Sequence, residues 1–298
     1  MSPEICLGSV QFGMDYGITN YSGKVKESEI KKILDRSYNC GIQLIDTAQA
    51  YGTSEKVLGK CINPKHQFLI ISKLKKQKNS FSKNDISKWE NNFQLTLNNL
   101  KTSKINGFLL HNSNDLLKEG SHFLKTWLKS LKQRKLVKEI GLSIYNSKDL
   151  NNIDLSNIDL VQLPLSIYDQ RLLKDGTIHK LKNIGCKVFI RSVFLQGLIL
   201  KSHKDWPSWV NQNNVKAQNR LERFAKEQNA SLLKLALAFA KKQDEVDAVV
   251  IGITSRKELE EIISVWNEKN DDLLNDEFKW ALEDETFLDP RNWNKSII

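Results

Sequence analysis

The chain has 298 residues, of which 40% are hydrophobic, and it carries a formal net charge of +10. This length suits two ordinary domains or one α/β barrel, and without a Pro/Gly/Ser-rich linker we expect a single barrel domain over residues 1–298. No apolar run approaches the ~20 residues that cross a bilayer, and the N-terminus does not read as a signal peptide. We therefore expect a cytoplasmic protein without a membrane partner.

Short apolar runs alternate with helical patterns along the chain. The predicted strands are 5–10, 43–45, 68–72, 107–110, 139–143, 160–163, 187–191 and 248–251. Helical spacing of apolar residues occurs at 30–34, 57–58, 89–100 and 124–131, and a further helix is expected at 232–242. Segment 201–228 is expected to form a large loop with a helix, and the last stretch, with Trp280, Phe287 and Trp293, an extra helix and a tail. This alternation predicts an α/β fold, a (β/α)8 TIM barrel.

The cysteines and the spread of charge exclude two further classes. The four cysteines are far apart, with no CxxC pair or His cluster, so we expect no metal site and no disulfide. The lysines are interleaved with Asn, Ser and Glu, and no RNP, helix-turn-helix or zinc signature is present. We expect a solvated surface and no nucleic-acid partner, although part of the charge can attract phosphorylated ligands.

Four polar residues stand at or just beyond the ends of apolar runs, namely Asp46, Tyr51, Lys73 and His111. In a parallel barrel, chemistry gathers where strands give way to loops. A Tyr hydroxyl has a pKa of about 10, which a nearby Lys ammonium is expected to lower, and an Asp beside that Lys keeps it charged. Singly, these residues also suit a turn cap, a solvated strand end or a core histidine. Together they indicate a catalytic set.

The motifs IDTAQAYGTSEKVLG, FLIISKL and GFLLHNS resemble those of the aldo-keto reductase family, and the resemblance runs from about Leu7 to about Ile263. It implies an NAD(P)H-dependent oxidoreductase that reduces an aldehyde or ketone. Tyr51 would be the general acid, Lys73 would lower its pKa, Asp46 would hold Lys73, and His111 would orient the carbonyl. The opening VQFGMDYGITNYSG resembles a bacterial branch associated with sugar metabolism, which implies a sugar-like small-molecule substrate.

No GxGxxG motif follows an early strand, which disfavours a doubly wound dinucleotide-binding domain. The resemblance implies instead that a nicotinamide dinucleotide lies extended across the barrel mouth. Small residues at the end of the first strand would let it approach, Ser143 and Gln162 would bind its amide, and Arg191 would stack on its ring. Ile144 stands where the family often has Asn. The segment after Arg191 also reads as a plain strand exit. The residues of the first strand and of the pyrophosphate loop are Gly8, Ser9, Ser192, Phe194, Leu195, Gln196 and Gly197.

The helix after the last strand begins at a ready anion site, as a helix N-terminus is, and the resemblance implies that it holds the adenosine 2′-phosphate. The spacing of Ser255 and Glu258 also fits a capping box that needs no ligand. Family members that favour the 2′-phosphate often carry Arg or Gln at Glu258 and Asn at Ile262. We expect NADP(H) rather than NAD(H). The phosphate-binding residues would be Gly252, Thr254, Ser255 and Arg256.

Aromatic loop residues are expected to select the substrate. We expect a monomer or weak oligomer, and the alternative function is a nucleotide-binding sensor or regulatory subunit that acts through a protein partner. The complete set of four polar residues favours the enzyme. The substrate-selecting residues would be Tyr16, Tyr21, Trp206, Trp209 and Trp293.

Overall fold

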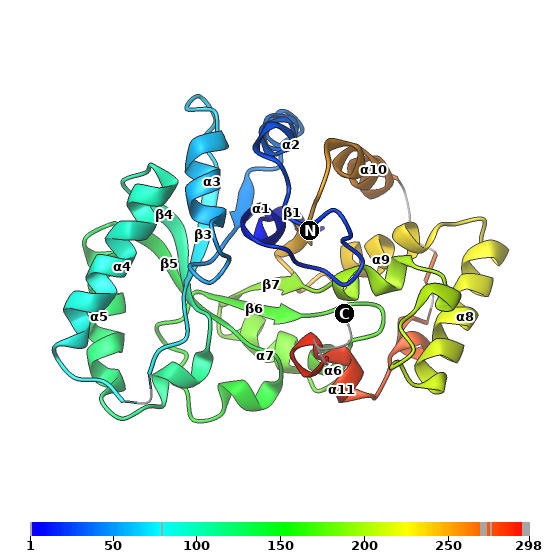
Figure 1. Cartoon of the computed structure of the whole chain (residues 1–298). Helices are drawn as coiled ribbons and strands as arrows, with labels where there is room; N and C mark the ends of the chain where they lie inside the picture. The colour runs from blue at the N-terminus through cyan, green and yellow to red at the C-terminus, as the bar shows by residue number, and fades with distance from the viewer. Residues whose placement is uncertain (1, 79, 269–272, 275, 294–298) are drawn as a thin grey trace.

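The computed structural model describes residues 2–78, 80–268, 273–274 and 276–293. Eight parallel strands close into a barrel in the order β1 to β8, with β1 hydrogen-bonded to both β2 and β8 (Figure 1). The predicted TIM barrel is therefore confirmed. The strands are β1 (Glu4–Gly8), β2 (Leu44–Asp46), β3 (Leu69–Leu74), β4 (Ile105–Leu110), β5 (Val137–Ser143), β6 (Leu160–Pro164), β7 (Lys187–Arg191) and β8 (Ala248–Gly252).

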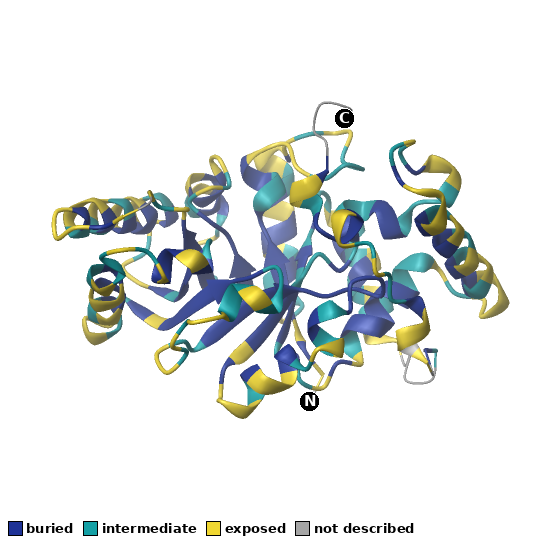
Figure 2. Cartoon of the chain, turned by 90° about the horizontal axis from the view of Figure 1, so that it is seen from below, coloured by how far each residue is buried: buried dark blue, intermediate teal, exposed yellow. Residues whose placement is uncertain are grey.

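Helices connect the strands and cover the barrel, with their outer turns exposed and the strands buried (Figure 2). In chain order they are α1 (Val10–Gly13), α2 (Glu27–Asn39), α3 (Ser54–Cys61), α4 (Asp85–Leu100), η1 (Ser113–Leu116), α5 (Ser121–Gln133), η2 (Ser147–Leu150), α6 (Arg171–Lys174), α7 (Thr177–Asn183), η3 (Leu195–Leu200), η4 (His203–Asp205), α8 (Gln212–Glu227), α9 (Leu232–Lys241), α10 (Arg256–Asn267), η5 (Glu277–Trp280), α11 (Glu285–Leu288) and η6 (Pro290–Asn292).

Side chains on each strand alternate between the barrel interior and the helix layer. Leu7, Ile45 and Phe108 belong to the larger core that packs against the helices. Their strand neighbours form a separate cluster inside the barrel, so on β1 to β4 and on β7 the next inward position lies at or next to the carboxyl end of the strand. The interior cluster comprises Cys6, Leu44, Ile71, Leu109, Leu160, Phe189 and Ala248.

The helices bury one face each, as their sequence spacing predicted. In α4, Trp89, Phe93 and Leu97 recur every four residues and are all buried. The long connection after β7 contains the expected helix, α8, whose first turn is capped by the Asn211 side chain accepting a hydrogen bond from the Asn214 N–H. The last stretch differs from the expected extra helix, since its described residues form only the short turns η5, α11 and η6. The side chains of Asp284 and Asp289 cap the first turns of α11 and η6. Each cap begins a new helical turn, so the segment does not form one continuous helix.

Within the described ranges, every helix is too short or too polar to span a bilayer. All four cysteines are free thiols, and Cys6, Cys61 and Cys186 are buried.

Candidate active site

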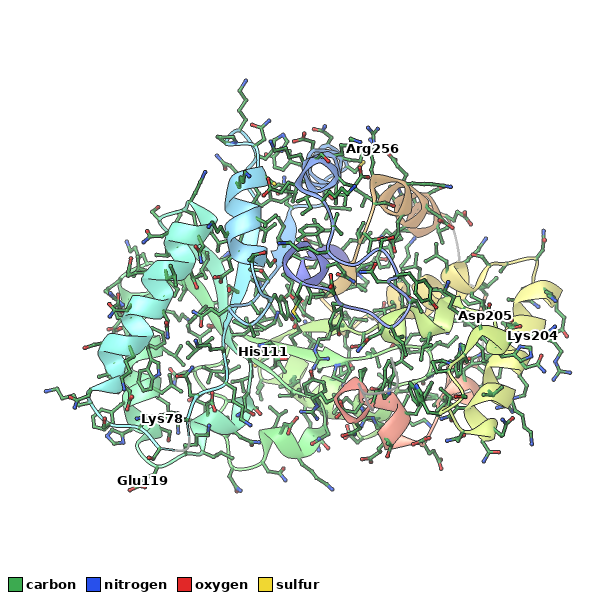
Figure 3. The ribbon with its side chains drawn as sticks, viewed as in Figure 1. Lys78, His111, Glu119, Lys204, Asp205 and Arg256 are labelled. Carbon is green, nitrogen blue, oxygen red and sulfur yellow. The ribbon has the colours of Figure 1, made fainter. Side chains whose placement is uncertain are left out.

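The alternation along the strands explains why the predicted polar residues meet. Asp46, Lys73 and His111 each stand two residues after an interior side chain of the barrel, namely Leu44, Ile71 and Leu109. They therefore point into the barrel at its carboxyl end. Figure 3 shows His111 near the middle of the molecule, with the barrel strands behind it.

The same rule places the predicted nucleotide-binding residues of the later strands at this end. Gln162 and Arg191 follow the interior residues Leu160 and Phe189 by two positions. Ser143 pairs with Gln162 across β5 and β6. The barrel mouth is thus built from inward positions of successive strands.

Lys73 and Asp46 form a buried ion pair. The Lys73 Nζ lies 2.6 Å and 2.7 Å from the two carboxylate oxygens of Asp46 and 3.0 Å from the backbone oxygen of Thr47. An ammonium group has only three hydrogens, so these three acceptors use them. The Tyr51 hydroxyl, 3.4 Å from the same nitrogen, receives at most a shared hydrogen bond.

Among the described residues, the Tyr51 hydroxyl accepts a hydrogen bond from Lys73 and has no acceptor for its own hydrogen. That hydrogen is therefore free to bond a ligand. The ring of Tyr51 lies edge-on to that of His111, with 5.7 Å between centroids. A free hydroxyl hydrogen beside an imidazole is suited to a ligand oxygen that enters the mouth.

The turn that carries Tyr51 is held against the end of α1. The Thr53 N–H donates to the backbone oxygen of Gly13 at 3.2 Å. A Cβ atom at Gly13 would lie 1.9 Å from the backbone oxygen of Tyr51. Ser54 donates to the oxygen of Ser9 at 2.9 Å, and the Ser9 hydroxyl donates to the oxygen of Asp46 at 2.8 Å. Ser9 thus joins β1, β2 and the Tyr51 turn through its hydroxyl and its backbone oxygen.

Burial controls the protonation of the two ring groups. Desolvation raises the pKa of Tyr51 well above 10.0, Asp46 raises it further, and Arg191 lowers it. The expected lowering by Lys73 is therefore not found, because burial, and after it Asp46, raises this pKa. Burial, followed by Lys73 and Arg191, lowers the pKa of His111 to about 3. At neutral pH, Tyr51 is protonated and His111 is neutral.

A cavity of about 630 Å³ opens above these groups. It brings together three of the four predicted catalytic residues, while Lys73 lies buried beneath them. The predicted residues that line it are Gly8, Ser9, Asp46, Tyr51, His111, Arg191, Ser192, Phe194, Gln196, Gly197, Gly252 and Thr254.

The other predicted residues lie outside the cavity lining. Ser143 ends β5 and Gln162 is the middle residue of β6, and both are buried; the Gln162 Nε2 donates to Asp46 Oδ1 at 2.8 Å. Leu195 is fully buried in the core. Ser255 caps α10, and Arg256 begins that helix. Leu195 is thus a packing residue of the loop instead of a side chain facing the cavity.

The loop after β7 has an unusual backbone. Ser192, Leu195 and Gln196 all have positive φ angles, of 62°, 46° and 54°, and Gly197 follows at 93°. Such angles are uncommon for residues other than glycine, and strained backbone tends to gather at ligand sites. Thr19 crosses from the first loop and donates to the Gln196 oxygen at 3.2 Å.

Tyr145 is a lining residue that the sequence analysis missed. Its ring faces the guanidinium carbons of Arg191 and Arg291 at 4.0 Å and 3.5 Å. Arg191 also donates to the oxygen of Ile144 at 3.0 Å. Ile144 itself is fully buried, so its side chain offers no polar contact where Asn is expected. The alternation along β5 could have identified Tyr145. Ile144 follows Leu142 on the outward face, so the next residue, Tyr145, points inward.

The predicted tryptophans do not line the cavity, in contrast to Tyr16 and Tyr21. Trp206 and Trp293 are 7% and 5% exposed, and their ring nitrogens donate to backbone oxygens of Leu198 and Phe287. Trp209 packs against Trp293, with 5.2 Å between ring centroids. Trp206 and Trp293 both pack against Phe287, so the three tryptophans form one aromatic cluster outside the cavity lining, and their expected role in substrate selection is wrong.

The model of the Aldo/keto reductase family matches residues 4–279, and the chain therefore belongs to the aldo/keto reductase family. Its members are oxidoreductases that reduce carbonyl compounds and generally use NAD(P)H. The resemblance found in the sequence motifs is thereby confirmed. No curated protein sequence matches the chain significantly.

Solved structures with the same fold include three bacterial enzymes. A putative aldo-keto reductase from Pseudomonas aeruginosa is 20% identical, with 89% of this chain and 90% of that chain covered and a TM-score of 0.65. The aldo-keto reductase AKR11C1 from Bacillus halodurans, in its holo form, is 19% identical over 89% and 87%, with a TM-score of 0.69. The glycerol dehydrogenase AKR11B4 from Gluconobacter oxydans is 17% identical over 91% and 90%, with a TM-score of 0.66. At these identities the likeness shows the fold alone.

Proposed function

We propose that the protein is an NAD(P)H-dependent reductase that converts an aldehyde or ketone to an alcohol, with Tyr51 as general acid. One observation carries this proposal. The uncommitted hydroxyl hydrogen of Tyr51 lies above the buried Lys73–Asp46 pair, in a cavity shared with His111. When bound, a reduced nicotinamide supplies the hydride that the carbonyl carbon takes up.

The four residues have separate roles in this reaction. The carbonyl oxygen takes the proton of the Tyr51 hydroxyl, and the phenolate left behind lies 3.4 Å from the Lys73 ammonium, which stabilises it. Asp46 keeps Lys73 charged and in place. His111 is neutral, so one ring N–H orients the carbonyl oxygen without competing as the acid. Solvent returns a proton to Tyr51 after the alcohol leaves.

The nucleotide is proposed to lie across the mouth between β5 and β8. The side-chain oxygen of Gln162 is buried and has no hydrogen-bond partner, which suits an amide donor of the ligand. Ser143 lies beside Gln162, and the planar guanidinium of Arg191 lines the cavity and suits stacking. The strained loop from Ser192 to Gly197 supports a role in holding the pyrophosphate. The sequence favoured NADP(H), but the hydrogen bonds of Glu258 and Glu29 at the start of α10 favour NAD(H).

A polar, sugar-like carbonyl compound is the proposed substrate. The cavity carries hydroxyl and amide groups from Tyr16, Thr19, Asn20 and Tyr145, which suit a ligand with several hydroxyl groups. The glycerol dehydrogenase of the same fold acts on a polyol by its name, which agrees with this substrate class.

Substitution of Tyr51 tests the proposal. Tyr51→Phe keeps the ring but removes the acid, so kcat for a reactive aldehyde such as 4-nitrobenzaldehyde should fall at least about a hundredfold. Nucleotide binding, followed by nicotinamide fluorescence, should stay close to that of the wild type. Near wild-type turnover in Tyr51→Phe would contradict the acid role. Nucleotide binding without turnover across a broad carbonyl panel would favour the sensor function instead.

A further inference from the structure

The start of α10 is where a phosphate of the ligand is expected, because it follows the last barrel strand and presents unpaired N–H groups. In this protein two of those donors already have partners, and so does the N–H of Thr254 just before the helix. The Thr254 N–H donates to Glu258 Oε2 at 2.7 Å, the Glu258 N–H donates to Ser255 Oγ at 3.1 Å, and the Arg256 N–H donates to Glu29 Oε1 at 2.8 Å. Two of these three acceptors are carboxylates.

Glu258 brings an uncompensated negative charge to the cavity wall. Its Oε2 also accepts the Thr254 hydroxyl at 2.8 Å, which fixes the side chain against the strand exit. In the part of the chain that the structure describes, no Lys, Arg or His forms an ion pair with Glu258, and its Oε1 has no hydrogen-bond partner. Glu258 lines the cavity. Its free oxygen accepts a ribose hydroxyl well and repels a phosphate dianion.

The second carboxylate comes from α2, which packs beside α10 (Figure 1). The Arg256 N–H holds the pKa of Glu29 below its usual value, so this carboxylate is charged at neutral pH. Lys32 pairs with its other oxygen at 3.2 Å. Glu29 therefore takes the helix-start donor that a phosphate would need.

The side chain of Arg256 is directed elsewhere. Its Nε lies 3.4 Å from Glu260, which also pairs with Arg36 at 2.8 Å. Figure 3 shows Arg256 at the outer rim near α2, away from His111. The Arg256 side chain is thus engaged with Glu260, while Glu258 and Glu29 hold the N–H groups of Thr254 and Arg256.

We propose that Glu258 and Glu29 make this site select NADH over NADPH, with the free oxygen of Glu258 accepting the 2′-hydroxyl of the adenosine ribose. This inference rests on the proposed nucleotide binding and concerns only the adenosine end. A ribose hydroxyl gains an acceptor there, whereas a 2′-phosphate meets two carboxylates and finds three backbone donors already bonded.

Direct binding measurements at fixed ionic strength test the selectivity. Dissociation constants of NADH, NADPH, ADP-ribose and 2′-phospho-ADP-ribose are measured by calorimetry for the wild type and for Glu258→Gln, Glu29→Gln and Glu261→Gln. Glu261 lies on the exposed face of α10 and makes no contact with this site, so Glu261→Gln controls for the change in net charge. The two ADP-ribose ligands lack the nicotinamide and report on the adenosine end alone.

We expect the wild type to bind each unphosphorylated ligand at least about tenfold tighter than its 2′-phosphorylated partner. Glu258→Gln keeps the Thr254 contacts and should narrow that ratio about tenfold, chiefly by tighter binding of the phosphorylated ligands. Glu29→Gln should narrow it in the same direction, and Glu261→Gln should leave it unchanged.

The outcomes separate this inference from the proposed function. Equal wild-type affinity for the two nucleotides, or a preference for NADPH, would overturn the selectivity while leaving the reductase proposal in place. An unchanged ratio in both Glu258→Gln and Glu29→Gln would also overturn it. Failure of all four ligands to bind would overturn the cofactor proposal itself. Selective binding of ADP-ribose by a protein without turnover would support the inference and contradict the reductase.

Discussion

The Lys73 ammonium and the Asp46 carboxylate lie 2.6 Å apart with side chains only 1% and 4% exposed. Gln162 adds a further hydrogen bond to Asp46 at 2.8 Å. Charges this deep are tolerated only when they are paired and hydrogen-bonded. The pair therefore supports the fold as well as the chemistry above it.

Removing both members of the pair should cost less stability than the sum of the two single removals. Lys73→Met leaves Asp46 as a buried charge, and Asp46→Asn leaves the ammonium, so each should lower the free energy of unfolding by about 3–5 kcal/mol. The double variant Asp46→Asn/Lys73→Met should lose clearly less than the sum. Urea unfolding of the four proteins measures this coupling. Additive losses would show that the two charges do not depend on one another.

Gly13 fixes the position of the acid from outside the cavity. A Cβ atom at Gly13 would lie 1.9 Å from the backbone oxygen of Tyr51 and 2.4 Å from the backbone nitrogen of Ser54. Gly13→Ala must therefore displace the turn that carries the acid, and a displacement of about 1 Å is expected to reduce kcat about a hundredfold. Steady-state reduction of 4-nitrobenzaldehyde by the folded variant measures the effect.

Gly59→Ala is the matched control for this substitution. A Cβ atom at Gly59 would lie 2.0 Å from the Asn99 oxygen, so the clash is equally severe but separates α3 from α4. Both variants should be less stable to urea, whereas only Gly13→Ala should lose kcat to this extent. Equal losses of kcat would mean that general destabilisation explains the result.

His111 should remain neutral across the working pH range. Its pKa falls from 6.5 to about 3 because burial and two nearby cations disfavour the imidazolium. The unfolded chain takes up this proton first, so the stability linked to His111 is complete above pH 6.5 and is lost as the pH falls toward 3.

Two measurements check this protonation state. The imidazole resonances of His111, assigned by comparison with His111→Gln, should not titrate as the pH passes 6.5. The pH profiles of kcat/KM for a neutral aldehyde should have the same shape near pH 6.5 in the wild type and in His111→Gln, because His111 does not titrate there. A titration of His111 near its ordinary pKa would contradict the buried, neutral state.

The barrel and its polar set were predictable because both depend on short-range patterns. Period-two alternation places Asp46, Lys73 and His111 on the inward face from sequence alone, and the eight strands were found with their ends shifted by at most two residues. The direction of the Tyr51 pKa was not predictable. It depends first on how deeply the folded chain buries the hydroxyl and then on the position of Asp46, and packing between distant strands sets both.

The residues at the rim were harder to predict because long-range packing decides them. Tyr145 enters the cavity through its stacking on Arg291, which is 146 positions away in the sequence. Whether Glu258 faces solvent or the strand exit depends on its hydrogen bonds to Thr254. Aromatic composition suggested a binding surface for the tryptophans, but Trp206 and Trp293 are buried against Phe287, and Trp209 packs against Trp293.

Trp293 tests that correction. It is 5% exposed and packs against Trp209 and Phe287, so Trp293→Ala should lower the free energy of unfolding by about 3–5 kcal/mol through the cavity it leaves. Because Trp293 does not line the active-site cavity, KM for a sugar-like aldehyde should stay close to the wild-type value. Tyr16→Ala provides the contrast, since Tyr16 lines the cavity and is 39% exposed. Tyr16→Ala should raise KM with little loss of stability in urea. A raised KM with normal stability in Trp293→Ala would instead show that Trp293 contacts the substrate.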